Sequence, residues 1–281
     1  MATLLLAMVN GQVIRFDTET EKYKVVFNSA VDDPLMGICR REDDLFVASL
    51  NRVYKIGWKD CSVITKTRAY FPSPDFHQMN YHEGRIYATA TKRNQIWAFD
   101  QDLQLKQKVR VLPPNPARRV RYKINYNHIN SIVNEGRAFY INLNWFTDQQ
   151  YADSGLLVTD EKFNEIKRFK YAWESHDFQF IDGKMMAICS TSGRDKKILH
   201  PPLSGLMVEG ELVWEHDPEE SFCKGLCHDD QYFYICGGKK AIRTMRKHTP
   251  GIIYVVDRIS LKLVKKIEHD QVRGIRGALV L

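Results

Sequence analysis

The sequence repeats one short layout three times, at intervals of about fifty residues. In each copy a histidine opens an alternating segment, a turn containing glycine follows, and an apolar segment comes next. The copies begin at His77, His128 and His176. Self-similarity at such a period is typical of repeat folds in which one supersecondary unit recurs. The repeat predicts that the whole chain is built from units of this kind.

Each unit divides into four short β segments separated by turns. The second unit shows this most completely, with apolar or alternating segments at 35–40, 45–50, 53–57 and 62–65. Four short strands per unit are the pattern of a β-propeller blade. No helical periodicity of useful length occurs in the sequence, which favours an all-β fold. Five units also have an aspartate where the third strand reaches its turn: Asp17, Asp60, Asp100, Asp160 and Asp257.

The number of strands predicts how the ring closes. The first unit lacks one strand, whereas the segment 272–281 supplies one strand beyond the last unit. Pairing the two would close the ring and remove an exposed edge. The sequence therefore predicts a single six-bladed propeller over 1–281, with four-stranded antiparallel blades. The predicted blades are 272–281 with 2–27, 35–66, 77–111, 128–170, 176–215 and 223–268.

Charge and cysteine usage narrow the class of protein. Lys and Arg number 41 against 34 Asp and Glu, giving a net charge of +7, which favours anionic partners. The first residues lack a basic region and their apolar run is short, so neither a signal peptide nor a membrane span is predicted. The six cysteines show no paired spacing, and Cys39 and Cys227 fall at matching repeat positions. We expect packed core thiols and a reduced, cytoplasmic protein without membrane partners.

Long connections gather on the face where the innermost strands begin. They lie at 112–126, 142–154, 191–204 and 237–251, and they are basic with interleaved aromatic residues. One interpretation is a cationic funnel for an anion above the axis; the other is a solvated rim that balances acidic turns elsewhere. The substrate-binding candidates are Arg118, Arg119, Arg121, Lys123, Trp145, Tyr151, Arg194, Lys197, Lys240, Arg243 and Arg246.

The three histidines that open inner strands are candidate metal ligands. Neutral imidazole is the commonest side-chain ligand, and a site of His77, His128 and His176 would leave coordination positions open for water and substrate. The alternative is that these side chains only bond buried waters or carbonyl groups. Cys223 or Lys224 falls at the matching place in the sixth unit, where Cys223 is interpreted as a core thiol.

Candidate acids and bases lie nearby. Asp177 and Glu174 could orient an imidazole or act as a base, although adjacent strand residues face opposite sides. His200 and His248 lie on long connections and could close over a ligand, or could simply be solvated. The catalytic candidates are therefore His176, His200, His248 and Asp177.

The repeat layout resembles six-bladed propellers grouped with NHL-repeat and gluconolactonase-like proteins. Gluconolactonase-like enzymes hold calcium with Glu, Asn and Asp around the axis, and the resemblance implies Asn130 and Asp177 as oxygen ligands. Some propeller lyases and oxygenases instead use axial histidines on a divalent metal, and the three histidine openings are more similar to these. Propellers serve many unrelated functions, so the resemblance does not select one.

These observations predict an enzyme with an axial histidine-lined site beneath basic loops. Its substrate would be a small anionic molecule (carboxylated, phosphorylated or sulfated) or an acidic sugar. Lyase or hydrolase chemistry fits, with a divalent metal ion as Lewis acid. The rival is a non-catalytic propeller whose basic rim binds a protein, an acidic glycan or nucleic acid. Nucleic acid is disfavoured because the basic residues surround a pit rather than follow an extended groove.

Overall fold

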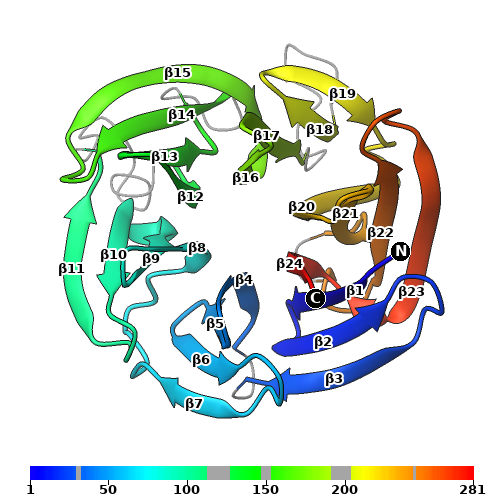
Figure 1. Ribbon diagram of the computed structural model, residues 1–281, viewed down its shortest axis with the longest axis horizontal. Helices are drawn as coiled ribbons and strands as arrows, with labels where there is room; N and C mark the ends of the chain where they lie inside the picture. Colours follow the sequence, from blue (N-terminus) through cyan, green and yellow to red (C-terminus); the bar gives the residue numbers. More distant parts are fainter. Residues whose placement is uncertain (30–32, 113–126, 147–152, 191–203, 243–244) are drawn as a thin grey trace.

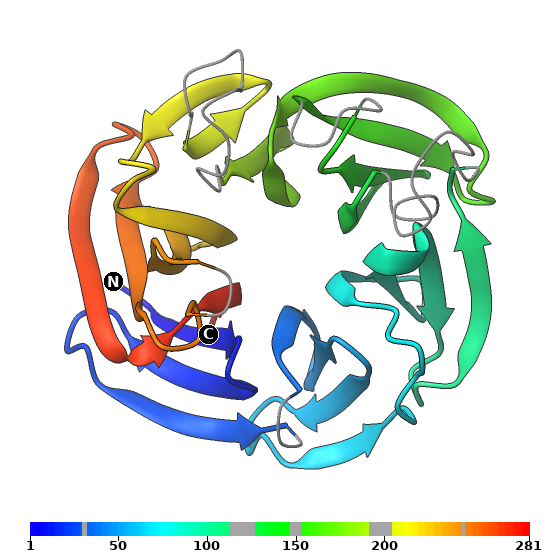
Figure 2. The same ribbon diagram turned by 180° about the vertical axis from the view of Figure 1, so that it is seen from behind.

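Six four-stranded antiparallel sheets surround a central axis as the blades of a propeller (Figure 1). The computed structural model describes residues 1–29, 33–112, 127–146, 153–190, 204–242 and 245–281. The view from behind shows the same closed ring (Figure 2). The predicted all-β fold with six four-stranded blades is confirmed.

The first three blades use strands from the amino-terminal part of the chain and one strand from its end. Blade 1 has the order β24-β1-β2-β3, and blades 2 and 3 contain β4–β7 and β8–β11. The strands are β1 (Thr3–Met8), β2 (Gln12–Asp17), β3 (Tyr23–Asn28), β4 (Leu35–Arg41), β5 (Asp44–Ser49), β6 (Val53–Gly57), β7 (Val63–Lys66), β8 (Phe76–His82), β9 (Arg85–Ala90), β10 (Gln95–Phe99) and β11 (Leu105–Arg110), with a short 3-10 turn η1 (Thr91–Arg93) after β9.

Blades 4, 5 and 6 follow in chain order and contain β12–β15, β16–β19 and β20–β23. Their strands are β12 (Ile129–Glu135), β13 (Ala138–Leu143), β14 (Asp153–Asp160), β15 (Glu165–Trp173), β16 (Ser175–Ile181), β17 (Lys184–Cys189), β18 (Gly205–Val208), β19 (Glu211–Glu215), β20 (Ser221–His228), β21 (Tyr232–Lys239), β22 (Pro250–Asp257) and β23 (Leu263–Arg273), and the chain continues into β24 (Ile275–Val280). The innermost strands are β24, β4, β8, β12, β16 and β20 (Figure 1).

The ring closes through β24, as predicted. This strand pairs antiparallel with β1, with Leu4 opposite Val280 and Leu6 opposite Ala278. It is the innermost strand of blade 1, because β1 is paired with β2 on its other side. Blade 1 is thus completed by a segment far from it in the sequence, and β1 has no open edge.

The core lies between neighbouring blades. The apolar run Leu4–Leu6 is fully buried because its two faces pack against different blades. The outermost strands carry charge instead, and β11 (LKQKVR) is largely exposed. Lysine on an edge strand discourages pairing with another chain. Sequence patterning thus separates the middle strands of the blades, which are largely apolar, from the outermost strands, which carry more charge.

Side chains at the turns and in the core agree with the expectations from sequence. The Asp17, Asp160 and Asp257 carboxylates accept main-chain N–H groups of the turns that follow them. All six cysteines are buried free thiols, which confirms the predicted core thiols. Within the described ranges, no helix has the length and apolar character needed to span a bilayer.

Candidate axial site

Each innermost strand is interrupted by a β-bulge near its start. The ladder shifts between Leu35 and Gly37 in β4, and corresponding shifts occur in the other five innermost strands. A bulge takes a residue out of the ladder and re-aims its side chain. One position near this shift is equivalent in all six blades, five residues before the residue that ends the pairing of the innermost strand, as Met36 is before Arg41. In blade 5 this residue is His176, which still pairs with Ile188 and directly precedes the shift. The residues at this position, which we call the axial ring, are Met36, His77, Asn130, His176, Lys224 and Arg276.

His176 lies between two other ring members. Its Nδ1 is 2.9 Å from Asn130 Nδ2, and its Nε2 is 3.1 Å from Lys224 Nζ. The imidazole of His176 is buried, and burial is the main reason that the pKa of His176 lies well below its ordinary value of 6.5. The positive charge of Arg276 acts in the same direction. His176 is therefore a neutral imidazole at physiological pH.

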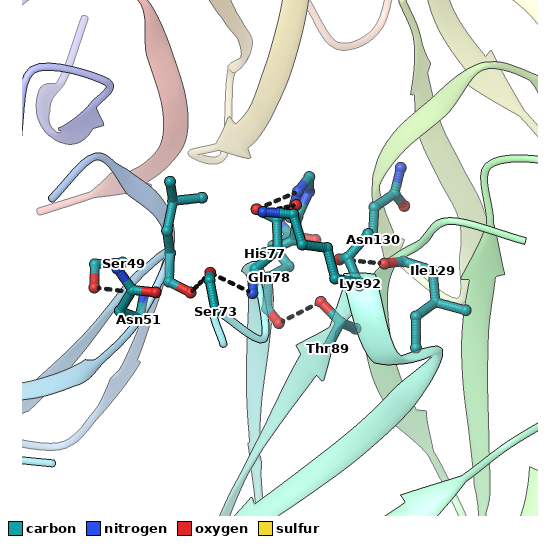
Figure 3. Close-up of polar contacts among 12 residues, drawn as sticks. Ser49, Asn51, Ser73, His77, Gln78, Thr89, Lys92, Ile129 and Asn130 are labelled. Carbon is teal, nitrogen blue, oxygen red and sulfur yellow. Dashed lines mark hydrogen bonds and ion pairs between the residues drawn. The ribbon is translucent and has the colours of Figure 1, made fainter. Parts of the chain in front are cut away.

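The segment of chain just before β8 determines where His77, the second residue of that strand, lies. Its Nε2 is 3.8 Å from Asp75 Oδ1, and Lys92 Nζ is also 3.8 Å from the Asp75 carboxylate. Figure 3 shows His77 beside Lys92, with Thr89 donating to the carbonyl of Gln78 below them. Asp75 has a left-handed φ of 57°, which turns the chain into the bulged strand. His77 consequently lies in a polar cluster of blade 3.

The structure places Asn130, not His128, at the ring position of blade 4. The strand begins at Ile129, and its bulge lies at Asn130. His128 precedes the strand with a left-handed φ of 49°, two residues before the ring, as Asp75 and Glu174 do in their blades. Its ring stacks on Trp145 with centroids 4.8 Å apart, and its edge meets His77 at 5.4 Å.

The three histidines are not found together as a metal-binding group in the part of the chain that the structure describes. Among the described residues, no group of three or more His, Cys, Asp or Glu side chains could hold a metal ion. His176 directs one ring nitrogen to an amide and the other to an amine, and His128 is stacked on an indole. A metal at His77, His128 and His176 stays a prediction from sequence.

Asp177 faces away from His176 and toward blade 6. Its Oδ2 accepts the N–H of Leu226 at 2.5 Å, and its Oδ1 accepts from Gln179 at 3.1 Å. Burial raises the pKa of Asp177 to about 7, against the opposing effect of these two hydrogen bonds. Asp177 therefore joins two inner strands and does not orient the imidazole beside it. Nor does it meet Asn130 to form the oxygen-ligand pair that the gluconolactonase-like resemblance implied.

Arg276 and Arg246 both lie near one aromatic ring. The Arg276 guanidinium carbon is 5.4 Å from the centre of the Phe222 ring, and that of Arg246 is 4.2 Å away. Phe222 precedes Lys224 by two residues on β20. These cation–π contacts fix both guanidinium groups near the start of β20.

The other candidates that the structure describes occupy varied places. Trp145 is buried, Lys240 pairs with Glu219 at 2.5 Å, and His248 is an exposed turn residue. The remaining candidates lie outside the described residues: Arg118, Arg119, Arg121, Lys123, Tyr151, Arg194, Lys197, His200 and Arg243.

Arg276 was missed by the reasoning from sequence, and Lys224 was considered only for its place in the repeat. Both can be found by counting five residues back from the end of the first strand of each blade. For Arg276 this requires recognising that the closing strand belongs to blade 1, where a hydrogen bond from Leu281 N–H to the Thr3 carbonyl lies in place of the hairpin turn of the other blades.

The comparisons with known proteins identify the fold. No protein-family model matches the sequence, and no curated protein sequence matches it. A propeller in the crystal structure of a nidogen/laminin complex is similar over 100% of this chain and 98% of that one, with a TM-score of 0.68 and 9% identity. A protein of unknown function from Bacteroides caccae is similar over 99% of this chain and 98% of its own, with a TM-score of 0.63 and 11% identity. The chain is thus a six-bladed β-propeller structurally like that of nidogen.

Proposed function

We propose that the axial ring binds a small anionic ligand with a carboxylate or phosphate group. The observation that carries this proposal is the composition of the ring, in which His77, His176, Lys224 and Arg276 occupy four of six equivalent positions and no carboxylate occupies any. Arg276 supplies a permanent charge in a planar fork that matches a carboxylate or phosphate. Lys224 adds a nitrogen group on the neighbouring blade 6, and His77 adds one on blade 3.

Two acidic side chains near the ring are engaged by other groups. Asp75 is engaged with His77 and Lys92, and Asp177 is turned to the backbone of β20. An anion at the ring would therefore meet nitrogen donors first. Because the site is partly buried, its charge–charge interactions are screened less by solvent than those of the outer strands.

The test is a comparison of two charge-matched variants. Arg276→Met should weaken the binding of inorganic phosphate or of a small carboxylate by roughly ten- to a hundredfold, because a hydrogen bond to a charged group contributes about 1.5–3 kcal/mol. Arg110→Met makes the same change of net charge on the exposed strand β11 and should leave affinity unchanged. Isothermal titration calorimetry measures both. Equal affinity of the two variants, or equally tight binding of neutral analogues, would refute the proposal.

The finer expectations from sequence remain predictions. These are lyase or hydrolase chemistry, a divalent metal ion, an acidic sugar as substrate, the NHL-repeat and gluconolactonase-like relationship, and a cytoplasmic location. The rival proposal, a binding module that uses its basic rim, depends mostly on side chains outside the described residues. Two rim candidates that are described, Trp145 and Arg246, are buried against His128 and Phe222.

A further inference from the structure

The protonation state of Lys224 follows from hydrogen bonds that begin at a main-chain carbonyl. Asn130 Nδ2 lies 2.7 Å from the carbonyl oxygen of Ser175, which can only accept. Asn130 Oδ1 accepts from Asn142 Nδ2 at 2.7 Å, and that same nitrogen is 2.8 Å from the Ser175 oxygen. Reversing the Asn130 amide would place two oxygens against each other. The group that Asn130 presents to His176 is therefore an N–H.

A neighbouring amide leaves one hydrogen of Asn130 for this contact. Asn144 is satisfied when its nitrogen donates to Ser175 O at 3.1 Å and its oxygen accepts from Trp145 Nε1 at 3.1 Å. In this orientation Asn144 presents no acceptor to Asn130. One Asn130 hydrogen then goes to Ser175 O, and the other goes to His176 Nδ1 at 2.9 Å.

The tautomer of His176 follows. A neutral imidazole carries one N–H, and His176 is neutral because its burial lowers its pKa. Since Nδ1 accepts from Asn130, the hydrogen is on Nε2 and points to Lys224 Nζ at 3.1 Å. An ammonium group has no lone pair to accept it. The Lys224 side chain is therefore an uncharged amine.

We propose that Lys224 is a nucleophile that forms an imine with a small carbonyl compound bearing an anionic group, such as a 2-oxo acid. This inference rests on the proposed function, because Arg276 would hold the anionic group while the neighbouring blade presents the amine. An uncharged lysine is the form that reacts with carbonyl carbon. The geometry thus assigns different roles to two adjacent ring positions.

The chemical step balances without a further reactant. The Lys224 lone pair exchanges its hydrogen bond with His176 for a bond to the carbonyl carbon, and the carbonyl π electrons move to oxygen. The two amine hydrogens leave with that oxygen as water, and a carbon–nitrogen double bond remains. His176 is a positioning residue here, because it holds the amine uncharged and does not contact the carbonyl carbon.

Reductive trapping tests the proposal on the full-length protein. Incubation with pyruvate and sodium cyanoborohydride at neutral pH should leave one carboxyethyl group, located at Lys224 by peptide mass spectrometry. Lys224→Arg should lose this modification, whereas Lys66→Arg, on exposed strand β7, should retain it. Modification spread over many surface lysines, with Lys224 labelled no faster than they are, would overturn the proposal.

The hydrogen-bond argument has its own test. Asn130→Asp replaces the donor by an acceptor, so the hydrogen of His176 should move to Nδ1 and Lys224 should become an ammonium. Trapping at neutral pH should then fall at least tenfold, while Asn134→Asp on the same strand should trap like the parent. Should Asn130→Asp not fold, ¹⁵N NMR of the parent protein reads the tautomer directly. A hydrogen on Nδ1 there would contradict the proposal.

The two proposals fail in distinguishable ways. Phosphate cannot form an imine, so its binding reports only on the anion site. Phosphate binding that depends on Arg276, without trapping at Lys224, would refute the imine and support the anion site. Trapping at Lys224 that is as fast with acetone as with pyruvate, and unchanged by Arg276→Met, would support the amine and refute its coupling to an anion.

Discussion

Asp177 is a single residue whose burial makes the stability of the fold depend on pH. Its pKa is about 7 in the folded protein and near 3.8 when exposed, so the folded state binds the proton more tightly. The stabilisation is complete below the unfolded value and is lost as pH rises through the folded value. The full effect corresponds to roughly 4 kcal/mol. His176 has the opposite sign, because its lowered pKa removes stability as pH falls below 6.5.

Replacement of Asp177 separates these two effects. In Asp177→Asn the loss of unfolding free energy between about pH 5 and about pH 7.5 should disappear, leaving the rise that His176 contributes. Urea denaturation at the two pH values measures this change in unfolding free energy. Asp230→Asn removes an exposed carboxylate and should keep the parent's pH dependence. A parent protein whose two urea midpoints match those of Asp177→Asn would contradict the assignment.

Residue positions in the ring show where reasoning from sequence succeeds and where it stops. The ring positions of His77 and His176 can be read from the sequence, because their spacing from the following turn is visible there. His128 lies two residues before the ring position of its blade. The sequence does not reveal this offset, because a one-residue bulge leaves no compositional mark. The role of Lys224 depends on the direction of the Asn130 amide, which is fixed by a carbonyl in the next blade and has no local signal.

At the scale of elements, neighbouring inner strands meet at the residue that follows each ring position. Ser131 accepts the N–H of Phe178 in the next blade at 3.2 Å, and Asp177 accepts that of Leu226. In blade 2 the equivalent residue is Gly37, which lies against the backbone of β8 at His77. The six innermost strands were predictable from alternation and turns. Whether the residue after a ring position is glycine or has a side chain that accepts an N–H of the next blade depends on the gap between the blades.

Gly37→Ala should disturb both the fold and the site. An added Cβ would overlap the carbonyl oxygen of His77, which is backbone and cannot rotate away. We expect a loss of about 1–3 kcal/mol in unfolding free energy, with weaker phosphate binding because His77 is displaced. At Gly238 the nearest atoms to such a Cβ are 3.5 Å away, so Gly238→Ala should change stability by less than about 1 kcal/mol. Chemical denaturation and calorimetry compare the two, and equal stabilities would show that β4 and β8 can separate.

At the scale of the whole molecule, the closing strand decides whether the ring unfolds as one unit. Removal of residues 275–281 exposes the edge of β1 and the apolar contacts of Ile275 and Ala278. The truncated protein should lose its cooperative thermal transition, as measured by circular dichroism and calorimetry. Arg276→Met keeps the strand and should melt cooperatively. A sharp transition in the truncated protein near the parent temperature would refute this role.

The position of Arg276 on β24 also bears on the lifetime of the folded state. A ligand held by Arg276 and by Lys224 would act as a clasp between the closing strand and blade 6, so the ring could not open there until the ligand had left. Saturating anion should then slow unfolding and lengthen the half-life against protease. The rate of digestion would then report the rate of ligand dissociation, even for a ligand that reacts no further.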